Sequence, residues 1–408
     1  MGGGLMQLVA YGAQDIYLTG NPQITFFKVV YRRHTNFAVE SIEQTFNGTP
    51  NFGSRVTATI SRNGDLVQQM YLEVVLPTTD TSGDKWIYGV GNAMIQKAEI
   101  EIGGQLIDRH YGEWLDIWTE LSVPEGKRVG YDDMVGNVLG GTTAYTTSTT
   151  RLYVPLQFWF NRNPGLALPL IALQYHEVKL NLDLTPSASL IYNSSTDGIP
   201  NGTLSFKLYV DYVYLDTDER RRFAQVSHEY LIEQVQFTGD ESVSSTDTSK
   251  NFTLNFNHPC KELIWVHKSG TIAGANTSFN WSLNGTTDSS LGADSFSQGK
   301  LQLNGHDRFT IRYSDYFRKV QNYEHHTRVP RTLLEGSNYR QQYIYTYSFA
   351  LSPEEHQPSG TCNFSRIDNA VLQLTYPTHS YALTLKVFAV NYNVLRIMSG
   401  MGGLAYSN

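Results

Sequence analysis

The stretch from Leu215 to Gln236 reads LDTDERRRFAQVSHEYLIEQVQ and lies near the middle of the 408-residue chain. Its first half crowds charged side chains, and Asp216 followed three residues later by Glu219 is a helix-start signature. We therefore expect a short exposed helix, supported by i,i+4 ion pairs such as Asp216 with Arg220, each worth about 0.2–0.5 kcal/mol. The position of this segment decides the fold, because the pattern before it recurs after it.

Six short patterns occur in the same order on both sides of the charged segment. They are Ile42-Glu43-Gln44 with Ile232-Glu233-Gln234, Val56–Val67 with Phe252–Ile264, Ile100–Gly104 with Leu301–Gly305, Tyr111–Leu115 with Tyr313–Phe317, Leu180–Leu182 with Leu372–Leu374, and Leu204–Tyr209 with Leu383–Phe388. Alternating strands resemble one another by chance, so one pair alone is weak. Six pairs in one order predict two copies of one unit, joined by the charged segment.

Composition favours a β-rich protein that does not coat nucleic acid. Aromatic residues make up 12% of the chain and charged residues only 17%, a profile typical of strands. The length suggests two or three domains, each able to bury a core. The formal net charge of −7 argues against direct nucleic-acid binding, because coating a phosphate backbone needs clustered Lys and Arg.

Cysteine content and hydropathy limit the cellular compartments in which the protein is expected. Cys260 and Cys362 are the only cysteines, so no disulfide framework exists, and we expect both to remain thiols in a reducing compartment. No apolar run approaches the ~18 residues that a membrane helix needs. The N-terminus lacks the basic region of a secretory signal, so we expect no secretion.

Local patterns predict strands with one inserted helix. Val178–Leu184 alternates apolar and polar residues, as a half-buried strand does. Val56–Ser61 and Met70–Leu76 also read as strands, and Asn63-Gly64 between them predicts a hairpin turn. The helical spacing of apolar residues in Tyr111–Leu121 predicts a short helix.

Many short strands, long loops and no βαβ rhythm predict an all-β protein of antiparallel sandwiches. Immunoglobulin-like, barrel and jelly-roll folds all fit this pattern. Each half is larger than the ~100 residues of an immunoglobulin domain, which suits jelly rolls with inserted loops better. The predicted domains are an N-terminal arm at 1–24, a first jelly roll at 25–215, a charged linker at 216–226, and a second jelly roll with a glycine-rich C-terminal tail at 227–408.

Longer motifs carry a family resemblance that runs from end to end of the chain. They are Ala10–Ala38, Asn163–Leu180, Leu215–Gly239, Gln357–Ala370 and Asn391–Tyr406. These motifs resemble the major capsid proteins of large nucleocytoplasmic DNA viruses, of the iridovirus and algal or amoebal giant virus type. The resemblance implies two consecutive eight-stranded jelly rolls with short inserted helices, a pseudo-hexagonal homotrimeric capsomer, and an icosahedral shell.

The resemblance also implies partners and a location. The partners would be further copies of the chain within the trimer and in neighbouring capsomers, minor capsid and penton proteins, and indirectly an internal viral membrane. The location would be the virion capsid, assembled in the host cytoplasm.

No catalytic, cofactor or metal site is predicted. His228 and the Glu after it lack the second His of a zinc-protease helix. His325 and His326 would point to opposite faces of a strand, and Glu354-Glu355-His356 lies between prolines, as an exposed turn does. A carbohydrate-binding or carbohydrate-cleaving β-sandwich remains the alternative function, although no opposed carboxylate pair marks a glycosidase.

Two sets of residues are candidates for modification or assembly. Eight Asn-x-Ser/Thr sequons occur, which chance in Asn- and Thr-rich loops explains; three fall in one polar loop and are possible glycosylation sites, namely Asn276, Asn280 and Asn284. The glycine-rich N-terminal segment carries more apolar side chains than a free tail usually does. We expect it to be an assembly arm that buries Leu5, Leu8, Tyr11, Ile16, Tyr17 and Leu18.

Overall fold

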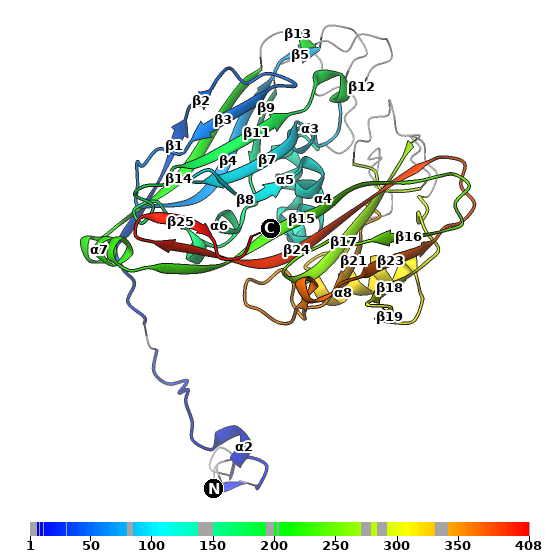
Figure 1. Cartoon of the computed structure of the whole chain (residues 1–408). Coiled ribbons are helices and arrows are strands. Elements are labelled where there is room, and N and C mark those ends of the chain that lie inside the picture. The colour runs from blue at the N-terminus through cyan, green and yellow to red at the C-terminus, as the bar shows by residue number, and fades with distance from the viewer. Residues whose placement is uncertain are drawn as a thin grey trace. The chain divides into compact units, whose positions relative to one another are not determined.

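The computed structural model describes all residues except 1–5, 8, 11, 30, 80–84, 138–149, 193–199, 202–203, 271–278, 284–291, 331–341 and 408. The chain divides into two units, Met1–Asn36 and Phe37–Asn408. Among its described residues, the first unit holds helix α2 (Ile16–Thr19) and no strand. The second unit holds the sheets, whose arrangement Figure 1 shows.

The N-terminal part of the second unit is a sandwich of two antiparallel sheets. One sheet has the order β1-β14-β4, with β9 and β10 both paired to β4, and the other has the order β2-β3-β11-β7-β8. The bounds are β1 (Phe37–Gln44), β2 (Phe46–Asn47), β3 (Arg55–Thr59), β4 (Leu66–Leu76), β7 (Ile95–Ile102), β8 (Gln105–His110), β9 (Thr150–Pro155), β10 (Leu168–Pro169), β11 (Val178–Leu184) and β14 (Ser205–Leu215). Two minor ladders join β5 (Thr78–Thr79) to β13 (Pro200–Asn201) and β6 (Lys85–Trp86) to β12 (Ile191–Tyr192).

The C-terminal part is a second sandwich with the same strand order. One sheet runs β15-β24-β17-β21, with β22 on β17 and β25 on β24; the other runs β16-β23-β18, with β19 and β20 both on β18. The bounds are β15 (His228–Val243), β16 (Ser249–Thr253), β17 (Pro259–Ser269), β18 (Gln298–Leu303), β19 (His306–Asp307), β20 (Arg312–Tyr313), β21 (Tyr345–Ser348), β22 (Cys362–Asn363), β23 (Ala370–Thr375), β24 (Leu383–Met398) and β25 (Met401–Leu404).

The connectivity is that of a jelly roll in both sandwiches. Each sheet has four principal positions, and the first strand of each roll lies beside the last strand of the same roll: β1 beside β14, and β15 beside β24. Consecutive principal strands lie in different sheets except at the hairpins β7–β8 and β18–β19, which stay within one sheet, as in a jelly roll. The predicted fold class, two consecutive eight-stranded jelly rolls, is confirmed.

Alternating burial along the strands builds a separate core for each roll. From Met70 to Leu76 in β4 and from Ser205 to Tyr212 in β14 every second side chain is buried, because side chains of a strand point alternately to its two faces. The first core gathers residues such as Leu72, Leu180 and Leu208 from both sheets. The second core is richer in aromatic rings and is centred on Trp265, which stacks on Tyr345 at 6.2 Å between ring centroids.

Helices occupy the connections between strands. They are α3 (Val90–Ala93), α4 (Gly112–Ser122), α5 (Glu125–Val135), α6 (Trp159–Arg162), α7 (Thr217–Gln225) and α8 (Gln321–His325), with short turns η1 (Pro164–Leu166), η2 (Ser187–Ser189), the π-helical η4 (Tyr316–Val320) and η5 (Phe364–Arg366). The helix predicted over Tyr111–Leu121 is confirmed as α4. Sequence reasoning missed α5, because three of its eleven residues are buried and they show no clear stripe.

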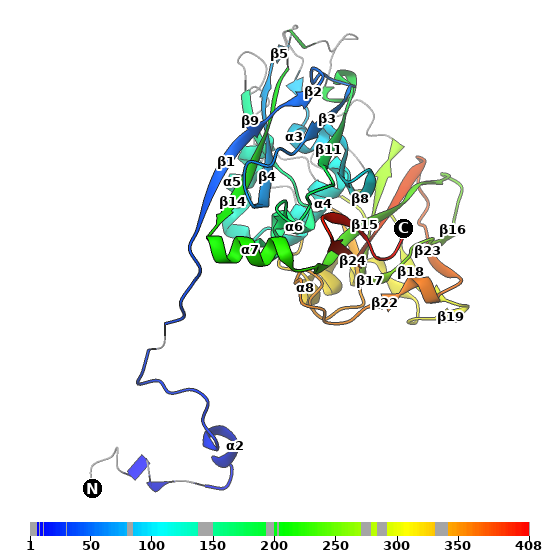
Figure 2. The same cartoon turned by 60° about the vertical axis from the view of Figure 1, so that its left-hand side comes forward.

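The charged segment forms α7, the predicted exposed helix, between the last strand of the first roll and the first strand of the second (Figure 2). The ion pair predicted between Asp216 and Arg220 is wrong. Asp216 instead accepts a hydrogen bond from the Thr217 amide at 2.9 Å, and Arg220 reaches the buried carboxylate of Asp65 at 3.0 Å. Tertiary contact with the first roll therefore replaces the local pair.

The hairpin predicted at Asn63-Gly64 is also wrong. The strands on either side, β3 and β4, belong to different sheets, so the segment crosses the sandwich. Glycine is needed here for close approach, because a Cβ at Gly64 would lie 2.7 Å from the Cβ of Tyr212. The buried Tyr212 side chain donates a hydrogen bond from its hydroxyl to the Ser61 carbonyl at 2.7 Å.

Strand register tests the internal repeat. Ile100 lies opposite Leu180, and Leu301 lies opposite Leu372, so these two sequence matches are structurally equivalent. The Ile-Glu-Gln match is not, since Ile42 lies opposite Val210 while Ile232 lies opposite Asn393, four residues beyond the equivalent place. An even shift keeps each side chain on the same face, which explains why the sequence patterns still agree.

We predict that Gly64→Ala destabilises the fold by about 1–3 kcal/mol, because the added methyl group overpacks Tyr212. The measurement is the free energy of unfolding from urea titration. Gly130→Ala is the control: its added Cβ meets nothing within 4 Å, and in the helix α5 alanine is favoured by up to about 1 kcal/mol. A Gly64→Ala protein as stable as this control would contradict the packing argument.

Candidate functional site

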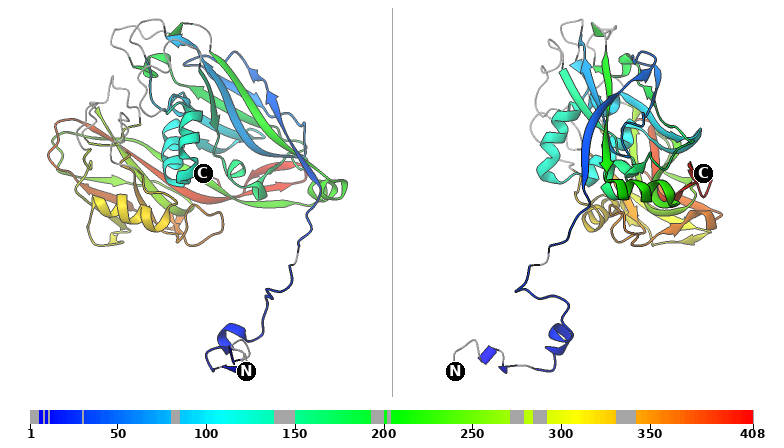
Figure 3. Two further views of the ribbon diagram at one scale, coloured as in Figure 1. Left: turned by 180° about the vertical axis from the view of Figure 1, so that it is seen from behind. Right: turned by 90° about the vertical axis from the view of Figure 1, so that its left-hand side faces the viewer.

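Helix α4 joins the two jelly rolls. It follows β8 of the first roll, and its Leu115 lies in the first core, whereas Trp114 and Trp118 lie in the second core. A Cβ at Gly112 would lie 2.1 Å from the carbonyl oxygen of Asn92, so only glycine lets the helix start this close to α3. Seen from behind, α4 stands between the strands of the two rolls (Figure 3).

The start of α4 rests on the outer face of the sheet of the second roll. The ring centroids of Trp114 and Phe388 are 5.4 Å apart. Beside them, the Lys386 ammonium contacts the Glu113 carboxylate at 2.9 Å and the Asp240 carboxylate at 2.6 Å. An aromatic contact flanked by an ion pair thus fixes the helix start on strand β24.

A buried carboxylate, Glu233, ties the rolls together a second time. Its Oε2 accepts a hydrogen bond from Arg162 of α6 at 2.7 Å, and its Oε1 accepts one from Lys261 of β17 at 2.8 Å. Burial alone would raise the pKa of Glu233, but the Arg162 charge, helped by His356 and Lys261, holds it at about 2. A charge in a dry place is tolerated only when it is paired in this way.

Arg328 makes a third tie from the second roll to the first. Its guanidinium donates to the Glu120 carboxylate at 2.7 Å and to the Glu120 carbonyl at 2.8 Å. Its amide donates to the Leu121 carbonyl at 3.1 Å, which satisfies one of the free carbonyls at the end of α4. The two partners of this ion pair are 208 residues apart in sequence, so the α4 end is held by a distant loop.

His326 lies between two carboxylates inside the second roll. Its Nε2 is 3.0 Å from Glu262 Oε2, and its Nδ1 is 2.9 Å from Glu354 Oε1. Burial alone would lower the pKa of His326, but the Glu262 and Glu354 charges raise it to about 9. His325 and His326 lie at the end of α8 and not on a strand, so that expectation was wrong. The expected turn at Glu354 is present, but the Glu354 side chain is only 16% exposed because it pairs with His326.

These clusters hold charges in place and expose no reactive group. A cavity of about 560 Å³ lies between the rolls, and its charged lining residues pair with one another, as Lys97 does with Asp183 at 3.0 Å. Within the described ranges, no three His, Cys, Asp or Glu side chains are placed to hold a metal ion. None of the helices in the described part of the chain is both long and apolar enough to cross a membrane.

The three predicted glycosylation sites fare differently. Asn280 has no exposed surface, and its side chain accepts a hydrogen bond from the Ser282 amide at 3.0 Å. Burial of this side chain argues against a glycan at Asn280. Asn276 and Asn284 lie outside the described residues, and modification there stays a prediction.

The residues predicted for the assembly arm lie in the first unit. Leu5, Leu8 and Tyr11 fall outside the described residues. Ile16, Tyr17 and Leu18 are on α2, where Tyr17 is 91% exposed. Sequence reasoning missed further exposed apolar groups that follow them, and these are Ile24, Phe26, Phe27, Val29 and Tyr31. Because β1 begins at Phe37, these residues precede the first strand.

The two cysteines are neighbours, which the sequence did not suggest. Cys260 and Cys362 lie directly opposite each other on β17 and β22. Burial raises the pKa of both thiols, which lowers the thiolate fraction that oxidation needs. That they remain thiols stays a prediction.

Comparison with known proteins relates the whole chain to viral shells. A family described as "Major capsid protein N-terminus" matches residues 25–216, and one described as "Large eukaryotic DNA virus major capsid protein" matches residues 219–403. The major capsid protein of Pyramimonas orientalis virus is 57% identical, and that of Paramecium bursaria Chlorella virus 1 is 46% identical; each alignment covers 100% of both chains.

Solved structures agree. The quasi-atomic model of the Paramecium bursaria Chlorella virus 1 (PBCV-1) capsid matches with a TM-score of 0.80 at 41% identity, over 94% of this chain and 100% of that chain. The Faustovirus major capsid protein matches with a TM-score of 0.73 over 95% of this chain and 94% of that chain. At 12% identity, the second similarity is one of fold alone.

We predict that Glu233→Gln costs about 3–5 kcal/mol of unfolding free energy at neutral pH, because Arg162 and Lys261 lose their shared buried charge. Glu229→Gln on the same strand is the matched control. Its pair with Arg396 at 2.8 Å is largely exposed, so it should cost less than about 1 kcal/mol. Equal losses in the two variants, measured by urea unfolding, would contradict the role of Glu233.

The pH dependence of the unfolding free energy tests the role of Glu233 a second time. The folded pKa of Glu233 lies below its ordinary value of 4.5, so its contribution is present above that value and is lost as the pH falls toward 2. His326 has a raised pKa, so its contribution is complete below 6.5 and is lost as the pH rises through about 9. Glu233→Gln should flatten the acid limb of the stability curve and leave the alkaline limb in place.

Proposed function

Since the chain belongs to the major capsid proteins of large eukaryotic DNA viruses, we propose that three copies close into a pseudo-hexagonal capsomer that tiles an icosahedral shell. The chain is a structural protein that forms the viral capsid with copies of itself, and it is not an enzyme. Family membership thus decides against the carbohydrate-cleaving sandwich that the sequence left open.

The observation that carries the trimer is the duplication. Both rolls have one strand order, so each chain contributes two similar blocks, and three chains contribute six. A threefold ring of such chains has a nearly hexagonal outline, and closed point-group symmetry is the rule for homo-oligomers. One gene product can then tile a surface that a true hexamer would tile.

The three ties between the rolls support this proposal, because a tile must keep its shape. The α4 start, Glu233 and Arg328 each bridge the rolls with buried contacts. A flexible pair of domains would lose more conformational entropy on entering a shell than a rigid pair. The joined rolls therefore enter assembly as one preorganised block.

The exposed apolar side chains of the first unit support an arm that acts in assembly. Phe26 and Phe27 are 91% and 99% exposed, and burying such surface against a partner releases roughly 25 cal/mol per Å². The partners we propose are minor capsid and penton proteins at the inner side of the shell, next to an internal membrane. Two thiols and no disulfide framework fit assembly in the host cytoplasm.

We predict that the purified chain is a trimer in solution. Light scattering at neutral pH should give three times the 46.0 kDa chain, about 138 kDa, and electron microscopy should show rings of six lobes. The contradicting result is a monomer or dimer at micromolar concentration, which would remove the capsomer proposal.

We predict that deletion of Met1–Asp15 leaves a folded trimer but reduces the yield of closed shells. The reason is that the arm buries its apolar groups against shell partners and not in its own jelly rolls. Tyr17→Ser should reduce the shell yield as well, whereas the polar control Thr19→Ser should not. The readouts are light scattering for the trimer and particle counts by electron microscopy. Loss of folding or of the trimer on deletion would show that the arm belongs to the core.

A further inference from the structure

The contact between the start of α4 and strand β24 joins the two rolls within the chain, and the repeat supplies a second pair of equivalent surfaces. Within one chain, the helix start of the first roll docks on the outer sheet face of the second roll. The second roll also has a helix start, at η4, and the first roll also has an outer sheet face, on β14 and β4. At these two surfaces the charged side chains pair within their own roll, Lys207 with Glu43 at 3.0 Å and Asp315 with Arg318 at 2.7 Å.

The outer sheet face of the first roll is equivalent to the docking face on β24. The repeat places Lys207 where Lys386 stands and Tyr209 where Phe388 stands. The strand register supports this alignment. On β4, the pairing with β10 begins four residues before the residue that lies opposite Tyr209. On β17, the pairing with β22 likewise lies four residues before the residue opposite Phe388. The docking face therefore exists twice in the chain, once occupied and once open.

The helix starts are equivalent as well. Tyr111 and Tyr313 follow hairpins that turn through residues of positive φ, Gly103-Gly104 and Asn304-Gly305. In each roll, the residue just before this tyrosine pairs with the first strand of the hairpin, β7 or β18, at the position four residues before that strand ends. The equivalent residues at the helix starts are Glu113 with Asp315 and Trp114 with Tyr316.

Exposure separates the occupied surfaces from the open ones. The side chains of Lys386 and Glu113 are 10% and 24% exposed, whereas those of Lys207 and Asp315 are 41% and 53% exposed. The open sheet face also carries stacked rings, since Tyr71 and Tyr209 lie 5.3 Å apart at 13° between planes. Both tyrosines are half-buried, and tyrosine is enriched at protein interfaces.

We propose that the helix start of the second roll of one copy docks on the outer sheet face of the first roll of the next copy. The contact repeats the internal joint, with Asp315 paired to Lys207 and Tyr316 packed on Tyr209. The occupant is a second copy of this chain, because the internal joint already shows which surface fits this face. The inference rests on the proposed trimer and names the residues that close it.

The proposed contact accounts for closure. A contact between two different surfaces is heterologous and either closes a ring or grows a filament. If the contact between copies has the geometry of the joint within a copy, every roll meets two neighbours through the same pair of surfaces. Three chains then give a ring of six nearly equivalent joints, three within chains and three between them.

Charge reversal tests the contact. In Lys207→Glu, and separately in Asp315→Lys, like charges meet at each junction, so the protein concentration at half-dissociation of the trimer should rise at least about tenfold. The double variant Lys207→Glu with Asp315→Lys should restore the trimer, because the charges are exchanged. The readout is the mass from light scattering over a dilution series, with circular dichroism to follow folding.

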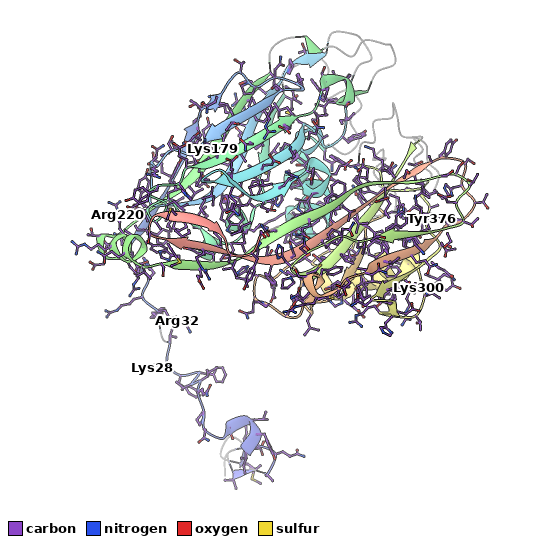
Figure 4. The ribbon with its side chains drawn as sticks, in the orientation of Figure 1. Lys28, Arg32, Lys179, Arg220, Lys300 and Tyr376 are labelled. Atoms are coloured by element: carbon purple, nitrogen blue, oxygen red, sulfur yellow. The ribbon has the colours of Figure 1, made fainter. Side chains whose placement is uncertain are left out.

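Lys179→Glu is the matched control. Lys179 lies on β11 in the other sheet of the first roll (Figure 4), and its side chain is 39% exposed, close to the value for Lys207. It should leave the trimer unchanged. A wild-type trimer that Lys207→Glu does not weaken would overturn this contact and leave the proposed capsomer standing, whereas a wild-type monomer would overturn both.

Cysteine crosslinking gives a second measurement that does not depend on charge. Tyr209→Cys combined with Tyr316→Cys, oxidised with copper phenanthroline, should give covalent dimers and trimers and no longer species on a denaturing gel. Each single variant should stop at the background of the wild-type chain. Monomer bands alone from a trimeric double variant would overturn the proposed contact.

Discussion

The packing of Trp114 and Glu113 against strand β24 is the contact on which the rest of the structure depends. It places a helix of the first jelly roll against the outer sheet face of the second, and Trp114 is buried in this contact. The Lys386 ammonium gains a carboxylate from the other roll at 2.9 Å, and it lies 5.5 Å from the centre of the Phe237 ring.

The buried ions make this joint specific as well as stable. A hydrophobic joint of the same size could slide, but the Glu233 carboxylate fits only where Arg162 and Lys261 both reach it. Removing one member of such a group leaves a charge in low dielectric, which costs more than the contact itself gains. A shell protein benefits from this property, because an error in the angle between rolls would be repeated in every tile.

Much of the fold could be predicted from the sequence, because local patterns control strands and short helices. The alternation of Val178–Leu184 and the helical spacing of Tyr111–Leu121 were sufficient for β11 and α4. The repeat was found by pattern alone, although its Ile-Glu-Gln match is out of register by four residues. Local chemistry failed at Asn63-Gly64, where tertiary packing against Tyr212 requires glycine and the chain crosses between sheets.

The junction could not be predicted, because its partners are far apart in the sequence. Arg162 and Glu233 are separated by 71 positions, and no spacing rule connects them. His326 was judged by strand geometry, but it follows a helix and lies between two carboxylates. Enzyme motifs, in contrast, can be judged from the sequence, because each motif needs particular residues at a fixed local spacing.

An electron-microscopy structure of the purified capsomer tests the central claim most directly: that the joint within the chain is repeated between chains. The account predicts a ring of six rolls in which Asp315 of each copy lies within about 4 Å of Lys207 of the next, with Tyr316 on Tyr209. A closed trimer in which the outer face of β14 meets solvent, or meets a different surface of its neighbour, would contradict it.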